Sequence, residues 1–230
     1  MARLVFHGQS CYEIETADGT RILIDPFLTG NPVAVVGPEH FTDRLDYLLL
    51  THGHGDHIAD AWDILEATDA TLIATYEIVS YAGEVQGHAN AHPMHIGGAH
   101  EFPFGRVKLT VALHGGKIDA PGAEAYTTTP AGILLTVDGT RVYHAGDTGL
   151  TRDMELLNGE VDVALVPIGD NFTMGPEDAA RAIEMIEPRI AVPNHYGTWE
   201  LIDVDPARFV DAVGDTAEVV ILQPGEALEL

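Results

Sequence analysis

Three histidines and one aspartate fall within the seven residues Thr51–His57, directly after the largely apolar run 46–50. Such crowding of metal-ligating side chains favours a cation site over a set of unrelated surface histidines. Gly53 and Gly55 allow tight backbone turns, so we expect a buried strand that opens into a loop. This loop would turn its histidines and its aspartate towards a common centre.

The spacing of these residues differs from that of helical zinc sites, which place two histidines one turn apart with a glutamate after the first. Neutral imidazole and carboxylate groups suit zinc, iron, manganese or nickel. Four ligands in one loop, with others contributed from elsewhere, exceed the number that one tetrahedral ion normally accepts. The loop therefore points to two metal ions.

Further candidate ligands follow other strand-like runs, where a scaffold presents reactive groups on loops. They are His114 after 106–113, Asp147 after 140–143, and His195 after 189–194. Each lies in or next to a segment that contains glycine or a turn signal. Taken alone, each of the three would more often be a turn residue or a hydrogen-bonded core group than a ligand.

Together, the His-x-His-x-Asp-His loop, the later single histidine, the Gly-Asp-Thr and the final histidine resemble the metallo-β-lactamase superfamily. Other segments resemble the UPF0173 group of metal-dependent hydrolases over nearly the whole chain: Ile24–Phe27, Gly97–Gly98, Tyr143–Thr148, Pro167–Gly175 and His195–Trp199. The resemblance implies an α+β fold, a four-layer αββα sandwich with the metals at strand ends between the two sheets.

The resemblance also implies a ligand set. His52, His54 and His114 would hold one metal; Asp56, His57 and His195 would hold the other; and Asp147 would bridge the two. A hydroxide shared by the ions would be the nucleophile, since coordination lowers the pKa of water to ~7. Asp56, His57 and Asp147 are the expected catalytic residues. Zinc is the first choice of metal, with manganese, iron or nickel as alternatives.

The chain departs from the family pattern at three places near these ligands. Gly8-Gln9-Ser10 stands where Gly-His-Ser is usual, and Gly115-Gly116-Lys117 stands where small hydroxyl residues are usual. Gly197 replaces a more typical asparagine. None of these changes removes a ligand, so we expect them to affect contacts with the substrate.

We expect residues 1–230 to form one domain, because no linker, low-complexity stretch or charge block marks a boundary. Asp18-Gly19 and Asp138-Gly139 predict hairpin turns. Strands are predicted at 4–6, 12–16, 21–25, 133–137, 141–144, 161–166, 190–193 and 219–222, and helices at 59–67, 176–187 and 206–213.

Several other polar residues have expected roles outside the ligand set. His88, His92, His95 and His100 could form a second metal site, but exposed or capping positions are favoured by their spacing. Asp25 and His144 are expected to orient ligands. The segment 171–176 is expected to be a substrate-side loop that leads into a helix at Pro176. Cys11 is expected in the core.

The charge balance is strongly acidic, with 36 acidic and 11 basic side chains and a formal net charge of −25. Salt screens such self-repulsion, so we expect a halophilic cytoplasm; an ordinary acidic protein is the alternative. The shortage of lysine and arginine argues against nucleic acid as a partner. Residues 1–4 lead straight into a strand, without the pattern of a signal peptide or membrane span.

The sequence thus predicts a cytoplasmic, dinuclear hydrolase that cleaves an ester-like bond of a small molecule, either a phosphodiester or a lactone or carboxylic ester. A homo-oligomer is compatible with this prediction. One alternative is a non-catalytic metal-binding or regulatory module, which would lack an open coordination position. The second alternative is a di-iron redox protein of the same fold. Such a protein would normally carry glutamate at the position of His54, together with a flavin partner domain.

Overall fold

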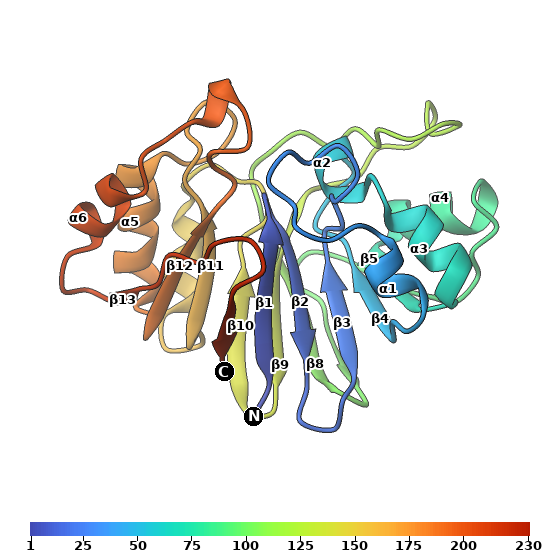
Figure 1. Ribbon diagram of the computed structural model, residues 1–230, viewed down its shortest axis with the longest axis horizontal. Coiled ribbons are helices and arrows are strands. Elements are labelled where there is room, and N and C mark those ends of the chain that lie inside the picture. The colour runs from blue at the N-terminus through green and yellow to red at the C-terminus, as the bar shows by residue number, and fades with distance from the viewer.

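Two seven-stranded sheets pack face to face in the computed structural model, which describes residues 1–230 (Figure 1). The first sheet has the strand order β14-β1-β2-β3-β4-β5-β6, and the second has the order β13-β12-β11-β10-β9-β8-β7. Helices α1, α3 and α4 cover the outer face of the first sheet, and α5 and α6 cover that of the second. This arrangement confirms the expected four-layer αββα sandwich.

The bounds of the elements are as follows. The first sheet contains β1 (Arg3–Gly8), β2 (Cys11–Glu15), β3 (Arg21–Ile24), β4 (Tyr47–Leu49), β5 (Thr71–Thr75), β6 (Ala91–Met94) and β14 (Ala227–Glu229). The second contains β7 (Ala99–Phe102), β8 (Gly105–Val111), β9 (Ala131–Val137), β10 (Thr140–His144), β11 (Val163–Pro167), β12 (Ile190–Asn194) and β13 (Glu218–Val219). The helices are α1 (Glu39–Thr42), α2 (Gly55–Ile58), α3 (Ala61–Thr68), α4 (Tyr76–Glu84), α5 (Pro176–Ile186) and α6 (Ala207–Val213), with 3-10 turns η1 (Arg152–Leu157) and η2 (Glu200–Ile202).

Each sheet is antiparallel in one half and parallel in the other. In the first sheet β1 to β3 pair antiparallel and β3 to β6 pair parallel; in the second, β7 to β10 pair antiparallel and β10 to β13 pair parallel. Parallel strands bring their carboxyl ends to one edge of a sheet, which is where α/β folds place ligands. In Figure 1 this edge is at the top, where α2 lies.

Apolar side chains fill the three spaces between the four layers. Ile14, Ile24, Leu135 and Val192 belong to the core between the two sheets. Strand β8 shows the alternation that produces such a core, because Val107 and Leu109 are buried while the intervening lysine and the flanking arginine are not. The spaces under the helices hold two further clusters, of 19 and 18 buried residues. Cys11 lies in the first of these, as expected.

Local signals set several boundaries as predicted. Asp138 and Gly139 both have positive φ, 48° and 87°, which is the conformation of a tight two-residue hairpin turn between β9 and β10. Helix α5 begins at Pro176, as predicted, because proline fits the first helical position, where no intrahelical partner for its nitrogen is needed. None of the helices has both the length and the apolar character that crossing a membrane would require.

Other boundaries were predicted wrongly. The expected helix at 59–67 is α3, which begins only at Ala61, because the chain turns at Asp60, whose carboxylate accepts the backbone N–H groups of Leu28 and Thr29 at 2.7 and 2.9 Å. The short helix α2 precedes it, in the segment that was expected to be a loop. The strand expected at 219–222 is paired only at Glu218–Val219. No prediction covered α4, β6 or β7.

Candidate metal centre

The backbone of the loop after β4 packs closely against the segment around Ile118. A side chain at Gly53 would place its Cβ 2.8 Å from the Cα of Ile118 and from the carbonyl oxygen of Lys117, so this position admits only glycine. The backbone N–H of Asp119 donates to the carbonyl of Gly53 at 2.7 Å. This close contact fixes the direction of the loop on both sides of His52 and His54.

Three imidazoles form the first cluster, on one side of the centre. His52 Nε2 lies 3.1 Å from His54 Nδ1, and His114 Nε2 lies 3.2 Å from the same atom. His52 is fully buried, whereas His54 and His114 are half-buried. Their ligand atoms all lie within 4.8 Å of one another, which is the arrangement needed to hold one cation.

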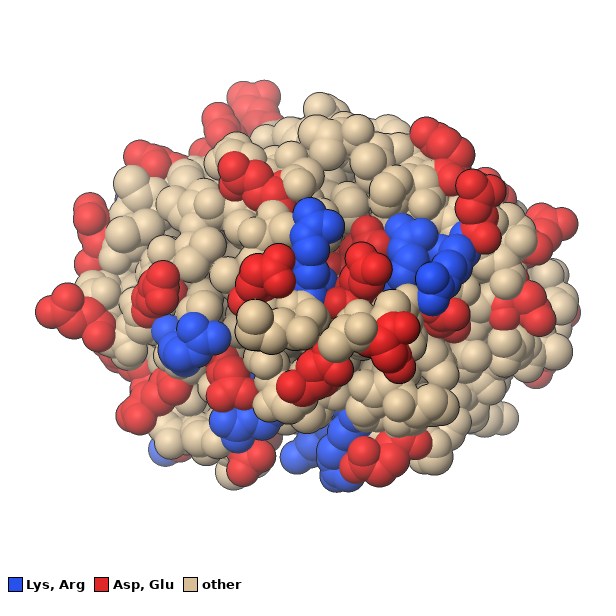
Figure 2. Space-filling model, turned by 60° about the horizontal axis from the view of Figure 1, so that its bottom comes forward, with Lys and Arg blue, Asp and Glu red and all other residues tan.

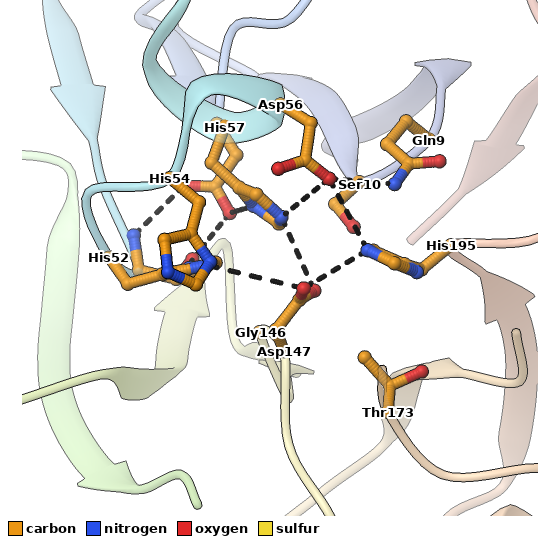
Figure 3. A network of polar contacts seen from close by, with 12 residues as sticks. Gln9, Ser10, His52, His54, Asp56, His57, Gly146, Asp147, Thr173 and His195 are labelled. Atoms are coloured by element: carbon orange, nitrogen blue, oxygen red, sulfur yellow. Dashed lines mark hydrogen bonds and ion pairs between the residues drawn. The ribbon is translucent and has the colours of Figure 1, made fainter. Parts of the chain in front are cut away.

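Two carboxylates and two imidazoles form the second cluster, and Figure 3 shows all four pointing towards one centre. Asp56 Oδ2 lies 3.4 Å from His195 Nε2 and 3.6 Å from His57 Nε2. Asp147 Oδ1 lies 3.3 Å from His57 Nε2, and its Oδ2 lies 3.0 Å from His195 Nε2. The residues come from α2 and from the loops after β10 and β12.

Asp147 lies between the two clusters. Besides its contacts with His57 and His195, its Oδ2 lies 3.4 Å from His114 Nε2 and 4.0 Å from His52 Nε2. Its loop approaches the strand ends closely, because Gly146 has a φ of +62° and a Cβ there would lie 2.8 Å from the carbonyl oxygen of Ala131. The glycine before Asp147 thus lets one carboxylate reach both clusters.

The buried polar atoms at the centre fit a cation. His57 Nε2, Asp147 Oδ1 and both ring nitrogens of His195 are buried and make no hydrogen bond. Buried polar atoms in proteins are almost always paired, so several unpaired ones in the same place need another partner. A divalent ion bound by imidazole and carboxylate supplies that partner for His57 Nε2, Asp147 Oδ1 and His195 Nε2.

Opposite charges hold the second cluster together. Burial by itself would raise the pKa of Asp147, but the His195 and His57 imidazoles hold it well below its usual value. Burial would likewise lower the pKa of His195, but the Asp147 carboxylate raises it to about 9. In the first cluster, burial holds the pKa of His52 well below its usual range. His52 thus offers a neutral imidazole and Asp147 an ionised carboxylate, whereas His57 and His195, whose pKa values are raised, must each release a proton when a metal binds.

A cavity of about 380 Å³ opens onto the centre. It is lined by His54, Asp56, His114, Asp119, Asp147, Phe172, His195, Trp199 and Leu201. A small-molecule substrate could therefore reach both clusters, and the volume lies within the usual range for ligand sites. Phe172 belongs to the segment expected to face the substrate.

The comparisons with known proteins agree with this geometry. A family model of the β-lactamase superfamily domain matches residues 20–196. A UPF0173 metal-dependent hydrolase from a Geobacillus species is 49% identical over 99% of this chain and 100% of the relative. The chain belongs to the UPF0173 group of the metallo-β-lactamase superfamily.

Solved structures show the same relationship. A metallo hydrolase from the hyperthermophilic archaeon Ignicoccus hospitalis is similar with a TM-score of 0.86 and 33% identity, over 100% of this chain and 99% of that one. A structure described as a metal-dependent hydrolase from Parabacteroides distasonis has a TM-score of 0.74 and 27% identity. The match covers 96% of this chain and 92% of that one. The UPF0173 resemblance expected from the sequence is confirmed.

Asp25 holds one of the predicted ligands of this UPF0173 protein in place. It is fully buried at the end of β3 and has a φ of +50°. Its Oδ2 lies 2.8 Å from His57 Nδ1, and its two oxygens accept the backbone N–H and the hydroxyl of Thr51 at 2.8 and 2.6 Å. One carboxylate thus fixes the ring of His57 and the start of the ligand loop, as expected.

His144 contributes by a different route from the one expected. Its Nδ1 accepts the backbone N–H of Gly146 at 3.0 Å, so its Nε2 carries the proton and donates to the carbonyl of Ser10 at 2.9 Å. It therefore positions the backbone before Asp147 and contacts no predicted ligand side chain. The residue ties the end of β10 to the turn between β1 and β2.

Gln9 has a role that the sequence alone did not reveal. Its Nε2 donates to Asp56 Oδ2 at 3.0 Å, its Oε1 accepts the hydroxyl of Thr198, and its carbonyl accepts the N–H of His195 at 2.9 Å. The UPF0173 pattern has histidine here, and the departure was the only signal. The amide connects Asp56 to the loop that carries His195 (Figure 3).

The remaining histidines lie outside the centre. His88 Nε2 lies 3.0 Å from the carbonyl oxygen of Ala70, and His95 stacks on Tyr76. His92 in the edge strand β6 and His100 in the edge strand β7 contact each other with tilted rings, whose centroids lie 4.2 Å apart. No third ligand joins them, so these residues do not form a second ligand cluster of three or more.

Proposed function

We propose that the protein is a dinuclear metal-dependent hydrolase that cleaves an ester-like bond of a small molecule, either a phosphodiester or a lactone or carboxylic ester. The observation that carries the proposal is the position of Asp147 between two clusters of ligand atoms. Membership of the UPF0173 group of metal-dependent hydrolases supports it. Zinc is the first candidate metal, with manganese, iron or nickel as alternatives.

In this proposal each residue of the centre has a separate task. His52, His54 and His114 hold one ion; Asp56, His57 and His195 hold the other; Asp147 contacts both. Two bound ions would activate a water at neutral pH and stabilise the attacking and leaving oxygens. Asp25 then sets the orientation of His57, and Gln9 sets that of Asp56. The proposed catalytic residues are Asp56, His57 and Asp147.

Two observations favour this proposal over the alternatives. The cavity above the centre gives a substrate access to the ligand atoms, which a purely structural metal site would not need. The first cluster contains His54, where a di-iron redox protein of this fold would be expected to carry glutamate. Both features favour hydrolysis.

The first prediction ranks three model substrates. No lysine or arginine lines the cavity, so a phosphomonoester dianion would find no fixed cation beyond the bound metals. We expect turnover of bis-p-nitrophenyl phosphate or of a small lactone to exceed that of p-nitrophenyl phosphate, measured at molar KCl with added Zn²⁺ or Mn²⁺. A clear preference for the monoester would overturn this ranking.

We further propose that the protein works in a cytoplasm of high salt. Eight of the 11 lysines and arginines already form ion pairs, so most of the 36 acidic side chains have no basic partner. Figure 2 shows one face of the molecule on which acidic groups surround nearly every basic group. Mutual repulsion of these carboxylates opposes the compact state unless salt screens it.

The second prediction follows from that repulsion. We expect the unfolding temperature to rise steeply between dilute buffer and molar KCl, because the Debye length falls from ~10 Å at 0.1 M to ~3 Å at 1 M salt. Thermal unfolding followed by circular dichroism over this range measures the effect. A flat profile would leave the acidic composition without a halophilic explanation.

A further inference from the structure

We infer that the substrate is a neutral ester or lactone whose apolar acyl or alkyl group binds against Phe172, Trp199 and Leu201, here called the apolar wall. The inference rests on the proposed hydrolase function and narrows its substrate class. It follows from the apolar side chains beside the metal centre, from their fixed positions, and from the charge of the remaining cavity lining.

The apolar wall exposes large hydrophobic side chains at the entrance to the centre. Phe172 is 48% exposed and Leu201 is 62% exposed, and both line the cavity that contains Asp147 and His195. Single exposed apolar residues are common, but their concentration at one cavity marks a surface that gains from being covered by a ligand.

Hydrogen bonds from the centre itself hold the loop of Phe172. The N–H of Met174 donates to the carbonyl of Thr148, the residue directly after Asp147, at 2.9 Å. Within the loop, the N–H of Asp170 donates to the carbonyl of Met174 at 3.0 Å, and that of Thr173 to the carbonyl of Asp170 at 2.7 Å. Phe172 therefore lies at the tip of a closed turn that is anchored to Thr148, the residue after Asp147.

The other side of the wall is anchored through Gln9. Thr198 donates its hydroxyl to Gln9, and the N–H of Gly197 donates to the carbonyl of Ile202 at 2.8 Å. The Trp199 ring packs against Phe27, with centroids 6.2 Å apart. A preformed apolar surface loses little conformational entropy when a ligand binds, so its burial contributes directly to affinity.

The charge of the cavity selects against anionic groups. Asp119 lines it beside Asp56 and Asp147, and no lysine or arginine does. Lys117, two residues before Asp119, forms an ion pair with it, and its side chain is 78% exposed. A carboxylate or phosphate on the apolar part of the substrate would therefore meet Asp119 without a compensating cation. A neutral chain meets the wall without this repulsion.

A series of p-nitrophenyl esters from acetate to hexanoate tests the inference, measured at molar KCl with added Zn²⁺. We expect kcat/KM to rise by about threefold per methylene until the chain outgrows the wall. Phe172→Ala and Leu201→Ala should flatten this rise. Leu156→Ala is the matched control, because Leu156 is 77% exposed and lies away from the cavity, and it should leave the series unchanged.

Binding of the neutral fluorophore N-phenyl-1-naphthylamine gives a readout that does not depend on catalysis. We expect its affinity to fall at least about fivefold in Phe172→Ala and Leu201→Ala but not in Leu156→Ala. For charge selection, Asp119→Asn should raise kcat/KM several-fold for an ester whose acyl chain ends in a carboxylate. The ratio of this value to the value for butyrate should therefore rise.

The outcomes separate the two proposals. Ester hydrolysis with no chain-length dependence, or with a dependence that the wall variants leave intact, overturns the inference but not the hydrolase function. Failure of the metal-loaded protein to hydrolyse any phosphodiester, lactone or ester overturns the function, while the fluorophore still tests the wall. A dimer in sedimentation velocity that Leu201→Ala dissociates would assign the wall to a second copy of the chain and overturn the inference.

Discussion

Replacing Asp147 by alanine is expected to lower kcat/KM by at least about 10³-fold, because this carboxylate is the proposed ligand of both ions. Its two oxygens lie 3.0 to 3.4 Å from nitrogens of His57, His114 and His195. Asp147→Asn keeps the size of the side chain but loses its charge, and we expect a similar loss. Steady-state hydrolysis with saturating Zn²⁺ measures the effect.

Two histidines outside the centre provide the controls for this prediction. His88 contacts the carbonyl of Ala70, and His95 stacks on Tyr76, so His88→Ala and His95→Ala should change activity by no more than about twofold. Circular dichroism must show that all variants remain folded. Equal losses in the Asp147 and control variants would mean that the centre has been placed wrongly.

Asp25→Ala is expected to destabilise the protein by about 3–5 kcal/mol, because it leaves the buried donors of His57 and Thr51 without an acceptor. For a chain of this length, the unfolding temperature should fall by roughly 10 °C. The milder Asp25→Asn should lower metal affinity about 10–100-fold, because the amide no longer fixes the His57 ring as an anion does. Thermal unfolding and metal titration measure the two effects separately.

Asp60 is a matched control for Asp25. It is also buried, and it accepts two backbone N–H groups, from Leu28 and Thr29, away from the ligand atoms. We expect Asp60→Asn to lower stability but to leave metal affinity unchanged. If Asp25→Asn bound metal as tightly as the wild type, His57 would not depend on Asp25 for its orientation.

The local patterns that predicted the fold were those with a direct physical cause. The apolar run before His52 forms β4, and the Asp138-Gly139 turn joins β9 to β10 with the expected positive φ at both positions. His114, Asp147 and His195 follow strand ends, so the sandwich brings them to one edge. Local patterns therefore identified these three residues as candidates, whereas their assignment to two metals came from the family resemblance and stays a prediction.

Features that depend on tertiary contacts were missed. Strand β6 contains Pro93 and the half-buried His92, and β7 contains the exposed His100. Neither strand shows a regular alternation, since both lie at sheet edges. The break between α2 and α3 depends on Asp60 bonding to a segment some 30 residues earlier. The contact between Gln9 and Asp56 likewise joins residues 47 positions apart. The expectation of one domain over residues 1–230 stays a prediction.

Metal content tests the central claim most directly. Elemental analysis of gently purified protein should find close to two equivalents of zinc, manganese, iron or nickel per chain. His114→Ala affects the first cluster and His195→Ala the second. Each variant should retain about one equivalent of metal. A folded, active wild-type preparation that holds only one tightly bound ion would contradict the dinuclear assignment.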